Sequence, residues 1–145
     1  MGNEAVFSPQ AEARIRKSFA AQSMMATLGA RLVQVARGAV RIEAPILPGS
    51  RQQHGFAHAG LSFAIGDSAA GYAALSVMPE GQEVLTTEMK IHLLAPARGD
   101  LLVAEGRVLR PGRRLVIVEA DVHAVDAGRE AHVARLVGTM IPLGA

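Results

Sequence analysis

The stretch "QQHGFAHAGLSFAIGDSAAGYAA", residues 52–74, joins a polar loop to a run of small and apolar residues that one acidic residue, Asp67, interrupts. From His58 to Val77 the pattern is helical, and twelve of those twenty residues are Ala, Gly or Ser. A helix that is apolar on nearly all sides is a buried helix. Each internal glycine costs about 1 kcal/mol of helix propensity, and close approach to a sheet that wraps around the helix would offset this cost. Residues 58–77 therefore predict a buried central helix.

The elements on either side of this helix complete an α+β pattern. Ser8 as N-cap and Pro9 at the first helical position predict a short N-terminal surface helix over residues 8–22. Residues 30–47 alternate apolar and polar side chains around Gly38, which predicts a hairpin of two strands. Residues 83–143 read as four more strands joined by short links, which favours an antiparallel meander.

The order of elements restricts the fold. One helix, two strands, a buried helix and four strands predict a curved, largely antiparallel sheet of about six strands around one long helix, which is the hotdog fold. The chain has 145 residues and shows no repeat or linker, so we expect one domain over residues 1–145.

Composition excludes several classes of protein. Half of the residues are hydrophobic and 19% are charged, as in ordinary globular chains. The formal net charge of +2 gives little reason to expect a nucleic-acid partner. The absence of cysteine excludes disulfides and thiolate nucleophiles. No signal peptide and no uncharged apolar run of membrane-spanning length is apparent, so we expect a cytoplasmic protein without membrane association.

The spacing of His58 and Asp67 carries a prediction about assembly. Nine helical residues span about 13.5 Å and rotate a side chain by about half a turn, so the two residues cannot meet within one helix. If both serve one active site, His58 must come from a second copy of the chain, in a homodimer with shared sites.

Less specific interpretations of the same residues remain open. Asp67 is also suited to be the N-cap of a helix that begins at Ser68, with His58 in the preceding loop. His58 alone fits a hydrogen-bonded structural histidine. His54 and His58, four residues apart, resemble a metal-binding pair, but no third ligand has clear spacing and we expect no metal.

The segment "HGFAHAGLSFAIGDSAAGYAA" resembles the signature of the PaaI-like (phenylacetic acid degradation type) hotdog thioesterases, which is roughly His-Gly-Gly, six residues, then Asp. Here His58-Ala59-Gly60 is followed by six residues and Asp67. The segments "VLTTEMKIHLLAPARGD" and "RPGRRL" also resemble the family, and the similarity covers nearly the whole chain. The resemblance implies hydrolysis of acyl-CoA thioesters without a metal or organic cofactor, in a homodimer or homotetramer.

The resemblance also implies roles for individual residues. Asp67 matches the catalytic carboxylate and His58 the histidine at the helix start. Ala59 matches the residue whose backbone N–H polarises the thioester carbonyl, and it replaces the usual first Gly. Thr86 matches a hydroxyl residue that positions the attacking water in some members. Gln52 falls where many members have Asn, one methylene shorter.

The residues themselves are compatible with this chemistry. The N–H groups of Ala59 and Gly60 at a helix start are unpaired within the helix and lie at its positive end. Asp67 would act as general base on water or as a nucleophile that forms a mixed anhydride. The predicted substrate contacts are His54 and Gly60, together with Arg110 and Arg113, which could meet CoA phosphates or simply be solvated.

These observations predict an acyl-CoA thioesterase. A hotdog hydratase or dehydratase is the rival enzyme, and a non-catalytic acyl-CoA binding protein is the rival from another class. The chain has neither a Gly-x-Ser-x-Gly elbow nor a phosphate-binding Lys-Ser/Thr loop, so serine hydrolases and P-loop enzymes are not favoured. The sequence does not define the acyl group.

Overall fold

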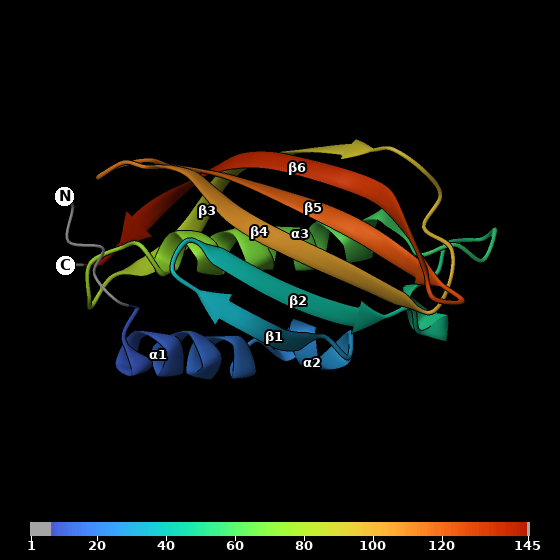
Figure 1. Cartoon of the computed structure of the whole chain (residues 1–145), viewed down its shortest axis with the longest axis horizontal. Coiled ribbons are helices and arrows are strands. Elements are labelled where there is room, and N and C mark those ends of the chain that lie inside the picture. The colour runs from blue at the N-terminus through green and yellow to red at the C-terminus, as the bar shows by residue number, and fades with distance from the viewer. Residues whose placement is uncertain (1–6, 145) are drawn as a thin grey trace.

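A six-stranded antiparallel sheet curves around the long helix α3 in the computed structural model, which describes residues 7–144 (Figure 1). The predicted hotdog fold is confirmed. The elements in chain order are α1 (Pro9–Ala20), α2 (Ser23–Thr27), β1 (Arg31–Ala36), β2 (Ala39–Pro45), the short 3-10 helix η1 (Pro48–Ser50), α3 (Ala59–Leu75), β3 (Glu83–Leu93), β4 (Leu101–Pro111), β5 (Val116–Asp126) and β6 (Arg129–Leu143).

The strand order is β1-β2-β4-β5-β6-β3, and this differs from a simple meander. The hairpins β4–β5 and β5–β6 form as expected, but β3 pairs with β6 at the sheet edge rather than with β4. The link of residues 94–100 can reach about 23 Å when extended, whereas β3 and β4 lie three strand spacings, about 14 Å, apart. A short link therefore crosses two intervening strands at the end of the sheet, and short length alone did not require adjacent strands.

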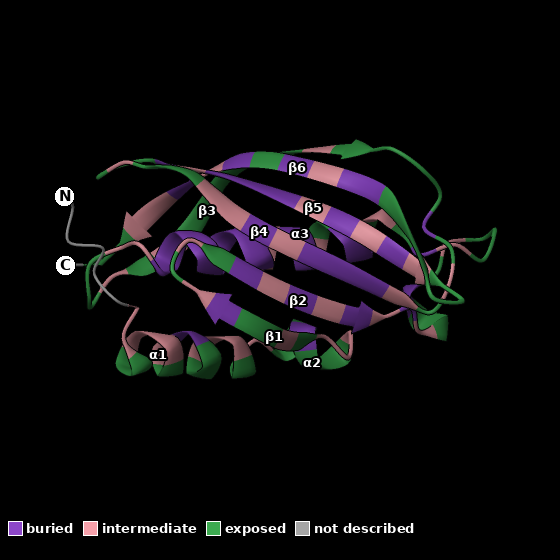
Figure 2. Ribbon diagram, in the orientation of Figure 1, coloured by how far each residue is buried: buried purple, intermediate pink, exposed green. Residues whose placement is uncertain are grey.

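Helix α3 is buried because the sheet comes unusually close to it. Its 17 residues include eleven buried ones, and Figure 2 shows the helix buried along most of its length. A Cβ at Gly106 of β4 would overlap the backbone of Ala69 and Ala70, and one at Gly66 would lie 2.9 Å from the Leu136 side chain. Small residues on both elements thus permit a contact that larger residues would prevent. This close packing holds Asp67 in a fixed position relative to the sheet.

The N-terminal segment forms two helices rather than one. Ser8 caps α1 by accepting a hydrogen bond from the N–H of Ala11, as expected for this N-terminus. Helix α1 ends at Ala20, and a second short helix, α2, follows, which the single predicted helix over residues 8–22 did not anticipate. Buried Ile15 and Met25 attach the two helices to the core. Both helices run beneath β1 in Figure 1.

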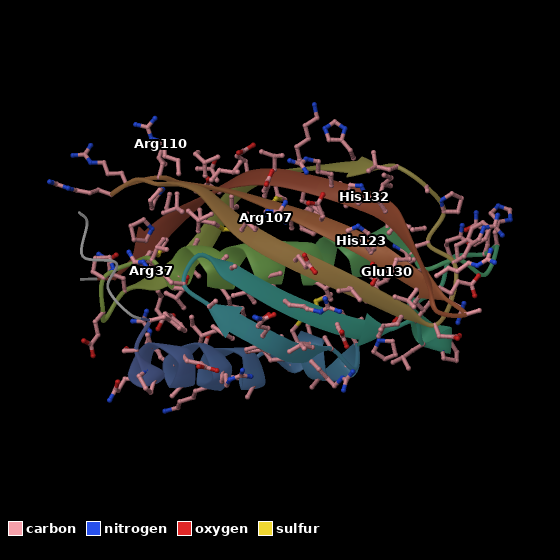
Figure 3. All side chains as sticks on the ribbon, in the orientation of Figure 1. Arg37, Arg107, Arg110, His123, Glu130 and His132 are labelled. Carbon is pink, nitrogen blue, oxygen red and sulfur yellow. The ribbon has the colours of Figure 1, made fainter. Side chains whose placement is uncertain are left out.

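The outer face of the sheet carries a ladder of ion pairs. Arg107 of β4 contacts Glu119 and Asp121 of β5, and Arg135 of β6 contacts the same two carboxylates. Partial burial tends to raise the pKa of Asp121, but Arg107 and Arg135 outweigh this effect and hold it below its ordinary value. His132 also bonds Asp121, and Arg107 and His132 lie over the front of the sheet in Figure 3. Positively and negatively charged side chains therefore pair with one another along this face of the sheet.

The edge at β3 is different, because large apolar side chains there are exposed. Leu85 and Leu93 of β3, with the adjacent Leu94, are about half exposed, and Phe63 of α3 is 38% exposed. An exposed apolar edge strand of this kind is unusual for a monomer and is typical of an interface.

Among the helices in the described part of the chain, none has the length and apolar character needed to cross a membrane.

Candidate active site

Asp67 lies in the middle of α3, on the side of the helix that faces β3. This position excludes the interpretation of Asp67 as the N-cap of a helix starting at Ser68, because α3 begins at Ala59. Burial raises the pKa of the Asp67 carboxyl above its ordinary value, and a hydrogen bond from Thr86 lowers it in part. Asp67 and Thr86 both line a cavity of about 300 Å³. The carboxyl is therefore accessible to a small molecule but poorly solvated.

Thr86 reaches Asp67 because of an irregularity in β3. Its Oγ1 donates to Asp67 Oδ1 at 2.7 Å and also contacts the sulfur of Met140 at 3.1 Å. Strict alternation would place Thr86 on the outer face with Glu88. The register between β3 and β6 shifts between these two residues, so Thr86 pairs with the buried Met140 on the inner side. A β-bulge that redirects one side chain in this way is common beside functional sites.

The start of α3 presents one unused backbone donor. His58 is the N-cap, and its Nδ1 accepts a hydrogen bond from the N–H of Gly60 at 2.8 Å. The Gly60 N–H is thus free of the helix, as expected, but already paired with His58. Within residues 7–144 the N–H of Ala59 has no acceptor. Because Nδ1 is an acceptor, neutral His58 carries its proton on Nε2, which adds a second donor.

Gln52 provides a third donor at the same place. Its Oε1 accepts from the backbone N–H groups of His54 and Phe56, which orients the amide so that its Nε2 is available. Gln52, His58 and Ala59 all line an open groove of about 580 Å³ at the helix start. Three residues with available hydrogen-bond donors therefore line one groove, and donors of this kind can bind an oxyanion or a carbonyl oxygen.

The two groups of residues do not meet within one chain. The groove at the start of α3 and the cavity that contains Asp67 and Thr86 are separate, with no lining residue in common. His58 and Asp67 are nine residues apart on the same helix, about 13.5 Å along its axis. Each chain thus contains two separate groups, which we call the acidic half-site (Asp67, Thr86) and the donor half-site (Gln52, His58, Ala59).

The remaining predicted contacts lie elsewhere. Arg110 and Arg113 are at the β4–β5 turn, at the end of the sheet opposite the start of α3, and Figure 3 shows Arg110 at that end. His54 is exposed in the loop before α3, and it is not among the described residues that line the groove. Within one chain, these three residues are brought to neither half-site.

The cavity beside Asp67 also contains polar residues that sequence reasoning missed. The hydroxyl of Tyr72 accepts a hydrogen bond from Gln22 Nε2 at 2.7 Å and lies 3.1 Å from Ser18 Oγ. All three residues line the cavity. The signal was present, since Tyr72 is the only tyrosine and lies in a buried helix, where its hydroxyl requires partners.

A hotdog fold with a carboxylate in the central helix and donors at the helix start defines a class of hydrolase candidates. Residues 54–131 match the family model described as the Thioesterase superfamily, and the chain belongs to this superfamily. The resemblance noted in the sequence is thereby confirmed at the level of the family, and hydrolysis of thioesters is the general activity that membership supports.

Solved structures agree with this assignment. A thioesterase family protein from Silicibacter pomeroyi is 40% identical, with a TM-score of 0.91 over 93% of this chain and 99% of that one. A Bacillus halodurans protein solved with CoA is 25% identical, with a TM-score of 0.73 over 92% of this chain and 84% of that one. The PaaI protein of the phenylacetic acid degradation operon of E. coli shares the fold, with 21% identity and a TM-score of 0.84 over 96% and 97% of the two chains.

Proposed function

We propose that this protein hydrolyses acyl-CoA thioesters to the free acid and CoA. The observation that carries the proposal is the Asp67 carboxyl, which is partly buried in a cavity, has a raised pKa and is bonded by Thr86. A carboxylate with a raised pKa is a stronger base than an ordinary aspartate, and is suited to take a proton from water. Membership of the thioesterase superfamily supports hydrolysis, and the CoA bound to the Bacillus halodurans neighbour supports a CoA thioester as substrate.

In the proposed reaction Asp67 acts as a general base. It takes a proton from a water molecule, whose oxygen attacks the thioester carbon. The C–S bond then breaks, and the sulfur leaves as a thiolate that accepts a proton to give free CoA. Thr86 donates its only hydrogen to Asp67, so its oxygen can accept a hydrogen bond from the attacking water. In the alternative route, Asp67 itself attacks the thioester carbon, and water hydrolyses the resulting mixed anhydride.

The donor half-site would stabilise the charge that develops on the carbonyl oxygen. The Ala59 N–H lies at the positive end of α3, and the Gln52 amide is oriented by its own loop. Such fixed donors need no reorganisation as the reaction proceeds, so each contributes substantially to the rate. His58 Nε2 would serve as a further donor at the same oxygen or at the adjacent amide of the CoA arm.

We infer that each active site is shared by two subunits of a homodimer. The acidic and donor half-sites are separated within one chain, and a reacting thioester must contact both. Large apolar side chains are exposed beside both half-sites, since Leu85 lines the acidic cavity and Leu93 lines the donor groove, and this supports pairing along β3. A two-fold axis there would place the start of each α3 near the middle of the other and would create two identical composite sites.

The pH dependence of the reaction should respond to Thr86. Because its hydrogen bond lowers the pKa of Asp67, the Thr86→Val variant should have a higher Asp67 pKa. The base must be ionised, so the acidic limb of the kcat/KM profile should move to higher pH. Thr87→Val is a matched control, because Thr87 bonds the carbonyl of Thr139 instead. An acidic limb that does not move in Thr86→Val would contradict Asp67 as the titrating base.

The first test of the function is thiol release from a panel of acyl-CoAs of different chain lengths, including aryl-acyl members. We expect steady turnover of at least one member with release of one thiol per acid formed. Binding without turnover on every member would instead identify an acyl-CoA binding protein. Hydration of a 2-enoyl-CoA without thiol release would identify a hydratase.

A further inference from the structure

The cavity beside Asp67 continues along α3 toward a second group of polar residues. Asp67 and Thr86 lie at one part of its wall, and Ser18, Gln22 and Tyr72 lie at another. Tyr72 is five residues beyond Asp67 in the same helix, which corresponds to about 7.5 Å along the axis. Met140 connects the two parts, because it contacts Thr86 and lies near Gly71. Helix α1 supplies Ser18 to the wall of this cavity.

The Ser18–Tyr72 pair has one hydroxyl hydrogen left over. Each hydroxyl carries one hydrogen, and the single bond between the two oxygens uses one of them. Gln22 donates to the Tyr72 oxygen and accepts nothing from it. The second hydrogen, which either the 5% exposed Tyr72 or the half-buried Ser18 can carry, has no acceptor among residues 7–144. Buried hydroxyl groups nearly always have a partner, so an unused donor that lines a cavity is suited to a ligand.

The part of the substrate that fits this cavity is the acyl group. A volume of about 300 Å³ lies at the small end of ligand pockets and cannot contain the nucleotide and pantetheine arm of CoA. If the thioester carbonyl lies beside Asp67, the acyl chain continues toward Tyr72. The separation of about 7.5 Å along the helix corresponds to an extended chain of about six carbons.

We propose that the preferred acyl group carries a hydrogen-bond acceptor, such as a hydroxyl or carbonyl oxygen, at its far end. This oxygen accepts the unused hydrogen of the Ser18–Tyr72 pair, so Ser18, Gln22 and Tyr72 determine specificity for the acyl group. The inference rests on the proposed hydrolysis of acyl-CoA, because it identifies the substrate class of that same site. It assigns a role in substrate selection to α1, which lies outside the central helix and sheet.

The test compares two thioesters of equal size, heptanoyl-CoA and 6-hydroxyhexanoyl-CoA. The acyl chain of the first ends in a methyl group, and that of the second ends in a hydroxyl group. The wild-type enzyme should favour the hydroxyl substrate in kcat/KM. In the double variant Ser18→Ala with Tyr72→Phe this preference should fall about tenfold, because the ring is retained while both hydroxyl hydrogens of the pair are lost. Either substitution alone would leave one hydroxyl hydrogen in place. The edge-to-face contact with Phe19, at 6.2 Å between centroids, supports the ring in both proteins. Thr27→Val, which removes an exposed hydroxyl in α2, should leave the preference unchanged.

A second variant locates the acyl chain without relying on Tyr72. A Cβ at Gly71 would meet only the terminal methyl of Met140, at 3.8 Å, and Ala favours the helix more than Gly does. Gly71→Ala should therefore fold normally and reduce the cavity volume between Asp67 and Tyr72. We expect kcat/KM to fall about tenfold for both seven-atom acyl chains and little for acetyl-CoA.

The outcomes separate this inference from the proposed function. If both thioesters are hydrolysed but the double variant of Ser18 and Tyr72 does not change the preference, the inference is wrong and the thioesterase activity stands. If Gly71→Ala affects acetyl-CoA and the longer chains equally, the acyl group does not lie in this cavity and the inference is again wrong. If wild type hydrolyses no acyl-CoA at all, both the proposed function and the inference fail.

Discussion

Replacing Asp67 by asparagine is expected to lower kcat/KM by about 10²- to 10⁴-fold, the range that general-base catalysis contributes. Asparagine has nearly the same shape, and its amide oxygen can still accept the hydrogen bond from Thr86. The substitution removes the ability to take a proton while leaving the packing of α3 intact. The measurement is thiol release from the best acyl-CoA, with wild type and Asp67→Asn assayed side by side.

The same substitution should not destabilise the fold. Burial raises the pKa of Asp67, so the folded chain holds this proton more tightly than the unfolded chain does. The free energy of unfolding therefore declines as the pH rises through the folded-state pKa, because the ionised carboxylate is poorly solvated. The neutral amide of the Asp67→Asn variant would lack this penalty. We expect the melting temperature of the variant to equal or exceed that of wild type at neutral pH, and the two to converge below about pH 3.9, the ordinary pKa of Asp.

Activity and stability together distinguish a catalytic carboxyl from a structural one. Asp126→Asn, at an exposed turn between β5 and β6, is the matched control and should retain both properties. If Asp67→Asn instead unfolds at a much lower temperature than wild type, the carboxyl stabilises the fold. Full activity in a folded Asp67→Asn protein would remove Asp67 from the mechanism.

The residue pattern of α3 and the order of the elements around it were sufficient to predict the hotdog fold. The run of small residues from His58 onward identified the buried helix, which extends from Ala59 to Leu75 rather than to Val77. Its glycines were also expected to allow close approach to the sheet, and Gly66 indeed packs against Leu136 of β6. A helix enclosed by a curved sheet needs small side chains, and these can be recognised in the amino-acid composition. The order of the strands cannot be recognised in this way, because pairing of β3 with β6 depends on contacts between segments that are far apart in sequence.

The site was only partly accessible to sequence reasoning. Alternation along β3 would place Thr86 on the outer face, and only its resemblance to a family position associated it with Asp67. The bulge that brings the two together depends on pairing with β6. The bond between Gly60 and His58 was likewise not apparent, because spacing shows which donors a helix leaves free but not which side chains accept from them. Tyr72 was overlooked because its partners belong to α1 and the adjoining turn.

Removing the Ala59 N–H should lower kcat by about 10²- to 10³-fold, as loss of one oxyanion donor does in other hydrolases. Ala59→Pro deletes this N–H at the first position of α3, where proline is well tolerated. His58 already has φ −63° and ψ 142°, which is the conformation that a following proline requires. Ala59→Ser keeps the N–H and is the control. A proline variant with wild-type kcat would exclude this donor from the mechanism.

Mixing the two defective variants tests whether the active site is shared. In a heterodimer of Asp67→Asn and Ala59→Pro subunits, a shared site would combine the intact Asp67 of one chain with the intact Ala59 N–H of the other. Random exchange in an equal mixture makes half of the dimers heterodimers, each with one intact site of two, so about a quarter of wild-type activity should return. Refolding each variant alone should not raise its activity above the low level of that variant. If the site lay within a single chain, every site in the mixture would keep one defect, and co-refolding would restore nothing above the two parents.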